Sequence, residues 1–284
     1  MQLNRAFYFL FLTALLLTFC SACQTSSQPK AITVETTSQA KPIIHNRIKN
    51  EKVIHVFVAL CDNKYQGIVP VPPKIGNGQD PANNLYWGCS YGVKSYFKNS
   101  KDWILQKNIF PVAAPILERC VYKHKLTNTW MVADAYDGQF IKQCTQDFLG
   151  AASGIRQDSV TTDAGHKLFA AGNADLLAYI GHDGLMDFRI TESYPANDSM
   201  KRETIILACI SKAYFAPILK QTKAIPVLWS TGLMAPEAYV LHDALAELIA
   251  NRPNETIRTS AAAAYSKYQK CSLKAAKNLL VTGW

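Results

Sequence analysis

The chain has 284 residues, 49% of them apolar, and its 30 Lys and Arg outnumber its 21 Asp and Glu, for a net charge of +9. This length suits one large domain or two small ones, and the apolar content allows a sizeable core. The basic residues are spread out and are not interleaved with aromatic stacking residues. The charge therefore predicts a solvated surface near an anionic envelope and excludes a nucleic-acid partner.

The first 23 residues are organised like an export signal. Arg5 precedes an apolar stretch over residues 6–19, and small residues follow; this is too short for a good spanning helix. The end of the segment, Ser21-Ala22-Cys23, resembles the signal of bacterial lipoproteins. The resemblance implies a lipid on Cys23, and Gln24 is not the Asp linked to inner-membrane retention, so we expect an outer-membrane anchor. Ordinary cleavage and release is the alternative.

A polar tract follows the signal. Residues 24–48 are rich in Ser, Thr and Gln and poor in bulky apolar residues, which predicts a disordered tether. We expect the folded domain to cover residues 49–284.

The first half of this domain has two clear strand patterns. "VIHVFVAL" (53–60) is apolar and β-branched, and "WMVADAY" (130–136) is similar. Between them, residues 61–84 are rich in Gly, Pro, Asn and Asp and predict a long loop, while residues 85–97 lead into a helix. Asp137 is expected to cap a further helix. One face of that helix is predicted to hold Phe140, Ile141, Cys144 and Phe148.

The second half alternates strands with helices. "LLAYIG" (176–181), "TIILAC" (204–209) and "AIPVLWS" (224–230) predict three buried strands, and Pro236 opens a helix. That helix has an apolar stripe made of Leu241, Leu245, Leu248 and Ile249. A last helix is expected over about 255–280. The alternation predicts an α/β fold with a mostly parallel sheet and helices on both faces, which binds ligands beyond the carboxyl ends of its strands.

His182 and Cys209 fall at two of these strand ends. If their strands are neighbours, about 4.8 Å apart, both side chains face one crevice. A free thiol has a pKa near 8.5, and a nearby imidazole can take its proton and later protonate a leaving amine. The N–H groups of Gly184 and Cys209 could form an oxyanion hole. Alone, Cys209 could equally be a core thiol or half of a disulfide, and His182 an ordinary loop residue.

The two blocks together resemble the caspase–gingipain–legumain clan of cysteine peptidases. In that clan a hydrophobic block ends in His-Gly and a second one ends in Ala-Cys; here the blocks are "LLAYIGHDG" and "TIILAC". The resemblance implies a caspase-like fold and a cysteine endopeptidase acting on peptides or proteins, with Cys209 as nucleophile and His182 as general acid/base. Asp183 stands where the clan has its glycine, and Ile210-Ser211-Lys212 replaces a Gly-containing turn. An inactive caspase-like lipoprotein that binds peptide or envelope partners is therefore the alternative.

Other polar residues near strand ends are candidates for the substrate pocket. They are Asp62, Asp134, Asp183, Asp187, Ser230 and Thr231. The acids outnumber the one nearby arginine, Arg189, which favours a basic substrate side chain. Each acid could instead be a turn or cap residue.

The remaining cysteines and histidines favour neither a metal nor a cofactor. Six cysteines follow Cys23, an even number that permits disulfides in an exported protein. No zinc-like spacing and no glycine-rich nucleotide motif occurs. The "HDG" stretch could ligate a metal in a phosphohydrolase, but the other histidines lack partner spacing except His242-Asp243, expected on a solvent-facing helix.

Overall fold

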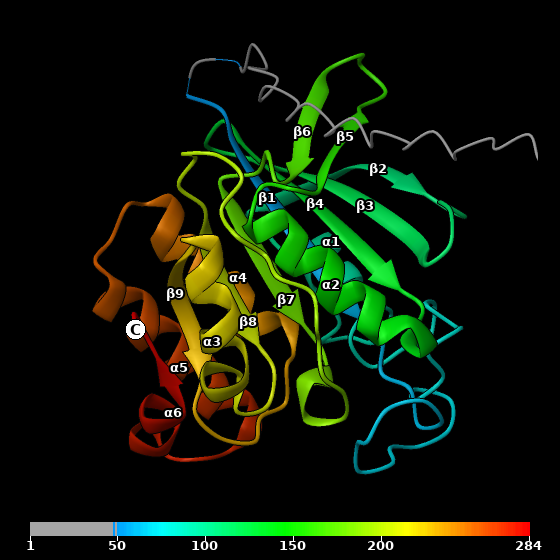
Figure 1. Ribbon diagram of the computed structural model, residues 1–284, viewed down its shortest axis with the longest axis vertical. Helices are drawn as coiled ribbons and strands as arrows, with labels where there is room; N and C mark the ends of the chain where they lie inside the picture. The colour runs from blue at the N-terminus through cyan, green and yellow to red at the C-terminus, as the bar shows by residue number, and fades with distance from the viewer. Residues whose placement is uncertain (1–47, 49) are drawn as a thin grey trace, which may run out of the picture. The chain divides into compact units, whose positions relative to one another are not determined.

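The computed structural model describes residue 48 and residues 50–284 (Figure 1). The predicted signal peptide over residues 1–23, with Cys23, lies outside the described residues, as does the predicted tether except for Ile48. Every helix in the described part of the chain is too short or too polar to cross a membrane.

The elements occur in the following order along the chain. They are β1 (Lys52–Ala59), α1 (Val93–Lys98), β2 (Trp103–Ile109), β3 (Ile116–His124), β4 (Thr129–Tyr136), η1 (Gly138–Phe140), α2 (Ile141–Ala152), β5 (Gln157–Thr161), β6 (Lys167–Ala171), β7 (Leu176–Ile180), η2 (Gly184–Met186), β8 (Glu203–Leu207), α3 (Ser211–Thr222), β9 (Ile225–Ser230), α4 (Ala238–Ile249), α5 (Asn254–Gln269), α6 (Leu273–Leu279) and β10 (Leu280–Val281).

A mixed eight-stranded sheet forms the centre, with the strand order β10-β9-β8-β7-β1-β4-β3-β2. The five strands from β9 to β4 in this order are mutually parallel. At the two edges, β10, β3 and β2 pair antiparallel. The prediction of an α/β fold with a mostly parallel sheet is confirmed, and the antiparallel edges are an addition to it.

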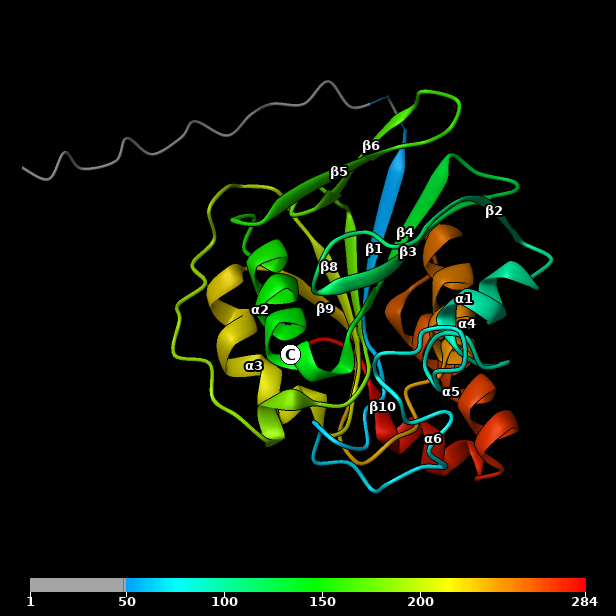
Figure 2. The same ribbon diagram turned by 90° about the vertical axis from the view of Figure 1, so that its right-hand side faces the viewer.

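Helices cover both faces of the sheet (Figure 2). The helices α1, α4 and α5 pack on one face, and α2 and α3 on the other. Seven consecutive residues of β1, from Val53 to Ala59, are therefore buried, because neither face of this strand meets water. This explains why the predicted strands have continuous apolar runs rather than an alternating pattern.

Three expectations about helices need correction. The single helix expected over 255–280 is two, because Lys270 adopts a left-handed conformation (φ 56°) and Ser272 caps a new helix by accepting from the Ala275 N–H. Phe140 precedes α2 and is 42% exposed, so it does not share the buried face of that helix. Helix α3 was not predicted; it tolerates Pro217 in its interior. Asp137 does cap the following turn, as predicted.

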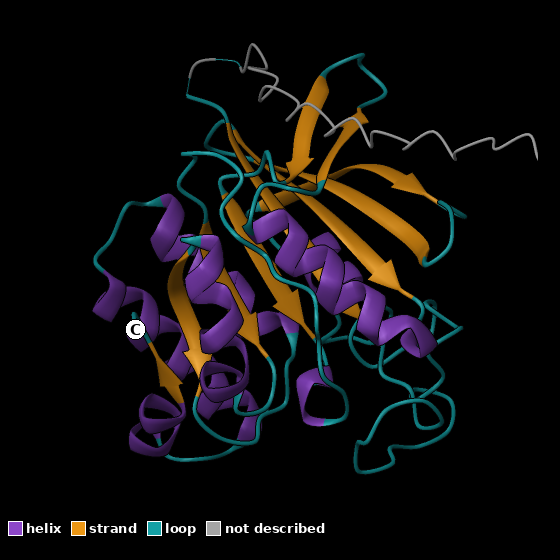
Figure 3. Ribbon diagram, viewed as in Figure 1, coloured by secondary structure: helices purple, strands orange, loops and turns teal. Residues whose placement is uncertain are grey.

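The carboxyl ends of the parallel strands meet at one edge, and most of the irregular chain gathers there (Figure 3). The loop between β1 and α1, the segment after β7 and the segment between β9 and α4 all lie at this edge. It is the edge at which open α/β sheets bind ligands.

Candidate active site

His182 and Cys209 follow neighbouring strands at matching positions. Strands β7 and β8 are adjacent and parallel, with Ile180 opposite Leu207 at their ends. His182 and Cys209 each come two residues later, so both leave the sheet at the same level. The predicted placement of these residues at the ends of two adjacent parallel strands is what the structure has.

Both side chains line one cleft of about 270 Å³. Its walls come from the loop after β1, from the turns after β7 and β8, and from the segment before α4. The lining residues are Gly67, Ile68, Val69, Tyr86, Gly181, His182, Met186, Cys209, Leu233, Met234 and Pro236. Apart from His182 and Cys209, none of these was a predicted site residue, and the sequence contains no motif that would have marked them.

A strained turn presents Cys209 at the end of β8. The next residue, Ile210, has φ 50° and ψ 27°, which is an unfavourable left-handed conformation for a β-branched side chain. The Ile210 N–H donates to the Gly232 carbonyl at 2.9 Å, and the Ser211 hydroxyl donates to the Ile206 carbonyl at 2.9 Å. These bonds hold the thiol between a strand and the start of α3.

Ser230 belongs to this scaffold and not to the substrate pocket. It is fully buried, its hydroxyl donates to the Ala208 carbonyl, and its N–H donates to the Ser211 hydroxyl at 3.0 Å. The expectation that Ser230 faces a substrate is therefore wrong, because both of its polar groups tie β9 to the turn around Cys209.

The environment of Cys209 favours the protonated thiol. Burial is the main cause that raises the pKa of Cys209, and the charge of Asp183 raises it further. The Met234 N–H, which donates to Sγ at 3.4 Å, lowers it in part. A thiol with a raised pKa needs a base to become a nucleophile at neutral pH.

His182 is positioned by Asp187. Its Nε2 lies 2.7 Å from Oδ2 of Asp187, and the same oxygen accepts the Gly67 N–H at 2.9 Å. Because a carboxylate only accepts, Nε2 carries the proton in the neutral ring, and Nδ1 keeps a lone pair. Among residues 50–284, Nδ1 has no hydrogen-bond partner, so it is free to accept a proton.

Asp187 was expected in the substrate pocket, and the structure gives it a different task. Its bond to the Gly67 N–H couples the loop that walls the cleft to the imidazole. A Cβ on Gly67 would lie 2.3 Å from Oδ1 of Asp187, so only glycine lets the loop approach this carboxylate so closely.

Asp183 lies buried beneath the cleft. Its Oδ1 accepts the Leu185 N–H at 3.0 Å, whereas its Oδ2 has no partner among the described residues. Burial raises the pKa of Asp183 to about 7, with a smaller increase from the charge of Asp187. A side chain with no exposed surface does not line a substrate pocket, which corrects the expectation for Asp183.

The two expected oxyanion donors differ in their placement. Within the described chain, neither the Cys209 N–H nor the Gly184 N–H donates a hydrogen bond, and Cys209 lines the cleft. Gly184 is buried where a Cβ would lie 2.6 Å from the Phe188 ring, and it is not among the lining residues.

The other predicted pocket residues lie elsewhere. Asp62 organises its own loop by accepting the Lys64 N–H at 2.8 Å and the Gln79 amide at 2.8 Å. Asp134 lies within β4, fully buried in an ion cluster. The Thr231 hydroxyl donates to the Asn278 carbonyl at 2.9 Å. None of the three lines the cleft.

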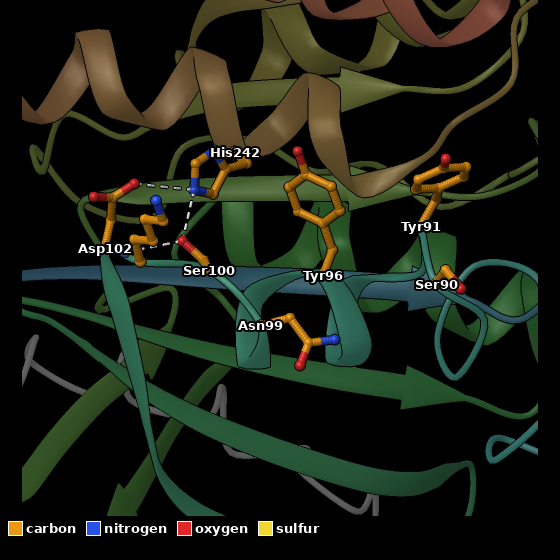
Figure 4. A pocket seen from close by; sticks show the side chains of 8 residues that line it. Ser90, Tyr91, Tyr96, Asn99, Ser100, Asp102 and His242 are labelled. Carbon is orange, nitrogen blue, oxygen red and sulfur yellow. Dashed lines mark hydrogen bonds and ion pairs between the residues drawn. The ribbon is translucent and has the colours of Figure 1, made fainter.

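A second hollow contains His242, which was expected to face solvent. It holds about 420 Å³ between α4 and the turn after α1 (Figure 4). His242 is mostly buried: its Nε2 is 2.9 Å from the Ser100 hydroxyl and 3.4 Å from Asp102, and its Nδ1 is 2.9 Å from Asp243. Flanked by two carboxylates, this ring fastens α4 to the turn at Ser100, and it leaves no nitrogen for a substrate.

All six cysteines of the described residues are free thiols, Cys209 included. No protein-family model, no curated protein and no solved structure matches this chain. A function for the protein therefore rests on the chemistry of the cleft around His182 and Cys209.

Proposed function

We propose that the protein hydrolyses peptide bonds with Cys209 as nucleophile and His182 as general acid/base, in a caspase-like domain over residues 49–284. One observation supports this above all: the thiol and an imidazole with an unbonded Nδ1 follow neighbouring parallel strands and line the same cleft. His182 also precedes Cys209 along the chain, which is the order that the clan resemblance implies.

The reaction has two stages. His182 takes the thiol proton at Nδ1, and the sulfur attacks the carbonyl carbon of the peptide, whose oxygen is stabilised by the Cys209 N–H. The C–N bond then breaks as His182 returns the proton to the amine, which leaves a thioester. Water, deprotonated by His182, attacks the thioester, releases the carboxylic acid and restores the thiol.

Asp187 serves this reaction as a positioning residue. Its bond to Nε2 fixes the ring and stabilises the imidazolium that forms when Nδ1 takes the thiol proton. Tyr179 supports the same segment, since its hydroxyl donates to the His182 carbonyl at 2.9 Å.

A peptide-binding module without catalysis is the second candidate. Three observations favour it: the raised pKa of Cys209, the buried Gly184, and the lack of a direct hydrogen bond between the His182 ring and the Cys209 sulfur among the described residues. Both candidates use the same cleft and differ only in whether the thiol is activated.

A thiol-reactive peptide probe separates the two. If the protein is a peptidase, the probe labels Cys209 stoichiometrically, and His182→Ala abolishes the labelling. His242→Ala is the matched control, because it removes the histidine of the second hollow and leaves the cleft intact. An unlabelled wild-type protein, or equal labelling of wild type and His182→Ala, would decide for the binding module.

We also propose that the protein is exported and anchored to a bacterial outer membrane by a lipid on Cys23. This rests on the resemblance of residues 1–23 to a lipoprotein signal and on the polar tract after them. Intact-mass analysis of membrane-extracted protein tests it. The expected mass is that of a chain starting at Cys23 with acyl groups added, and an unacylated chain would contradict the anchor.

A further inference from the structure

The walls of the cleft are apolar. Besides the two glycines and the catalytic pair, every lining side chain is aliphatic, a thioether, a proline or a tyrosine: Ile68, Val69, Tyr86, Met186, Leu233, Met234 and Pro236. Three of them are unusually exposed for their type, since Val69 is 88% exposed, Leu233 71% and Met186 38%. They come from three different segments of the chain and meet at one cleft. Their exposure to water is unfavourable, and an apolar group that covers them would be stabilised by the hydrophobic effect.

The cleft offers no charge for a basic or acidic substrate side chain. None of its lining residues is Asp, Glu, Lys or Arg. The acids beside the lining residues are engaged or buried. Asp187 holds His182 and the Gly67 N–H, and Asp183 is fully buried. Glu237, which follows Pro236, accepts from the Tyr239 hydroxyl and the Gln269 amide. A lysine or arginine entering the cleft would lose hydration against walls that carry no acidic side chain.

We propose that this cleft selects a large apolar side chain, such as Leu, Met or Phe, at the substrate residue whose carbonyl meets Cys209. The volume of about 270 Å³ lies near the lower end of ligand pockets, which start at roughly 300 Å³, so it suits one large side chain with its backbone. This replaces the basic specificity that the sequence favoured. The position of the selected residue next to the cut bond rests on the proposed peptidase function; the apolar preference itself does not.

The loop that carries Val69 links recognition to chemistry. Gly67, two residues before Val69, is bonded to Asp187, which positions the imidazole. An apolar side chain seated against Val69 and Leu233 would therefore press on the same loop that holds the base in place.

The test measures binding without catalysis. Fluorescent peptides that differ at one position, which holds Leu, Lys or Asp, are titrated against the Cys209→Ala protein and followed by anisotropy. We expect the Leu peptide to bind at least about tenfold more tightly than the Lys and Asp peptides, the discrimination typical of an apolar pocket.

Two further variants locate the preference. Leu233→Glu in the Cys209→Ala background should abolish the advantage of the Leu peptide. Leu126→Glu is the matched control, since Leu126 is also 88% exposed but lies in the turn between β3 and β4, outside the cleft, and it should keep the advantage.

Equal binding of the three peptides, tighter binding of the Lys or Asp peptide, or no binding of any would overturn the proposal. So would an advantage that survives Leu233→Glu. A failure of the peptidase function would look different. The peptide probe would then leave Cys209 of the wild type unlabelled, while the Cys209→Ala protein would still prefer the Leu peptide in the binding test.

Discussion

Two of the histidine–aspartate pairs among the described residues have different roles, one inside the sheet and one just beyond its edge. In the buried ion cluster (His55, Asp134, Arg119 and Asp158), His55 uses both nitrogens: Nε2 lies 2.9 Å from Asp134, and Nδ1 accepts the Ala171 N–H at 2.8 Å. In the cleft pair (His182 and Asp187), Nε2 is bonded and Nδ1 is not, among the described residues. In the ion cluster both ring nitrogens are hydrogen-bonded, and the pair stabilises the fold. In the cleft pair one ring nitrogen stays unbonded, which suits the pair to proton transfer.

Two buried aspartates, Asp134 in the ion cluster and Asp183 beneath the cleft, also differ in how many of their oxygens are bonded. Burial alone would raise the pKa of Asp134, but the bonds from Arg119 and His55 outweigh it and lower the pKa to about 2. Asp183 has one N–H donor and an unpartnered oxygen, and burial raises its pKa to about 7. A buried carboxylate is tolerated in the ion cluster and costly beneath the cleft. Four substitutions test this contrast, ordered by their expected effect on the free energy of unfolding.

Asp134→Ala should have the largest effect. Removing this carboxylate leaves Nε of Arg119 and Nε2 of His55 without a partner in the interior, so the protein should lose about 3–5 kcal/mol of stability. Urea unfolding at pH 7 measures it. Asp187→Ala is the matched control and should cost less than about 1 kcal/mol. Similar losses in the two variants would mean that the cleft pair is as structural as the ion cluster.

Asp183→Asn should change how stability depends on pH. The pKa of Asp183 rises from its usual 3.8 to about 7, so the folded state keeps a proton that the unfolded state has lost. The retained proton stabilises the folded state fully below about pH 4. As pH rises to about 7 this contribution is lost, and the free energy of unfolding falls by an amount on the order of 4 kcal/mol.

Asparagine cannot ionise, so the Asp183→Asn protein should lose this slope and be the more stable one at pH 8. Asp134 acts in the opposite sense, because its lowered pKa gives stability that disappears only as pH falls towards 2. Urea unfolding from about pH 2 to 8 covers both effects. An unchanged slope in Asp183→Asn would show that Asp183 ionises normally in the folded protein.

Cys209→Ala should abolish any peptidase activity at a small cost in stability. A methyl group replaces a partly buried thiol, so the expected cost is about 1 kcal/mol. Thermal unfolding and a thiol titration in denaturant measure this, and the titration should fall by one thiol. Loss of a disulfide would instead cost about 2–5 kcal/mol and expose a new partner thiol. That outcome would identify Cys209 as half of a bridge.

Asp187→Asn should have the smallest effect on stability and a large one on reactivity. Asp187 is a partly exposed residue, so the free energy of unfolding should change by less than about 0.5 kcal/mol. Without the carboxylate, the His182 imidazolium that forms when the ring takes the thiol proton is less stable. Labelling of Cys209 by the peptide probe should therefore slow by at least about a hundredfold.

The pH profile of the labelling rate distinguishes positioning from mere packing. Asp187→Asn should move its lower limb to lower pH, because the imidazolium that blocks the base at low pH has lost the carboxylate that stabilises it. Gly67→Ala should act in the same direction, since a Cβ there would displace Asp187. A normal pH profile in both variants would remove Asp187 from the mechanism.

Much of the sheet could be predicted from the sequence because its central strands are buried on both faces. β1, β4, β7, β8 and β9 have continuous apolar runs, and each was placed within a few residues. The strands β2, β3, β5 and β6 were missed because they lie at an edge or in a hairpin, where polar and apolar residues mix. Helix α3 was missed because it contains Pro217 in its interior, a residue that normally ends or kinks a helix.

The sequence by itself determined the positions of His182 and Cys209, because the end of a buried strand is a local pattern and parallel strands end at one edge. Only the tertiary structure decided what the aspartates do. Asp187 meets Gly67 from 120 residues away, and Asp134 meets His55 from 79 residues away. Whether a carboxylate is paired, buried or free depends on such distant partners, and no local pattern encodes them. The apolar character of the cleft was decided in the same way, since its walls come from loops that only the folded sheet brings together.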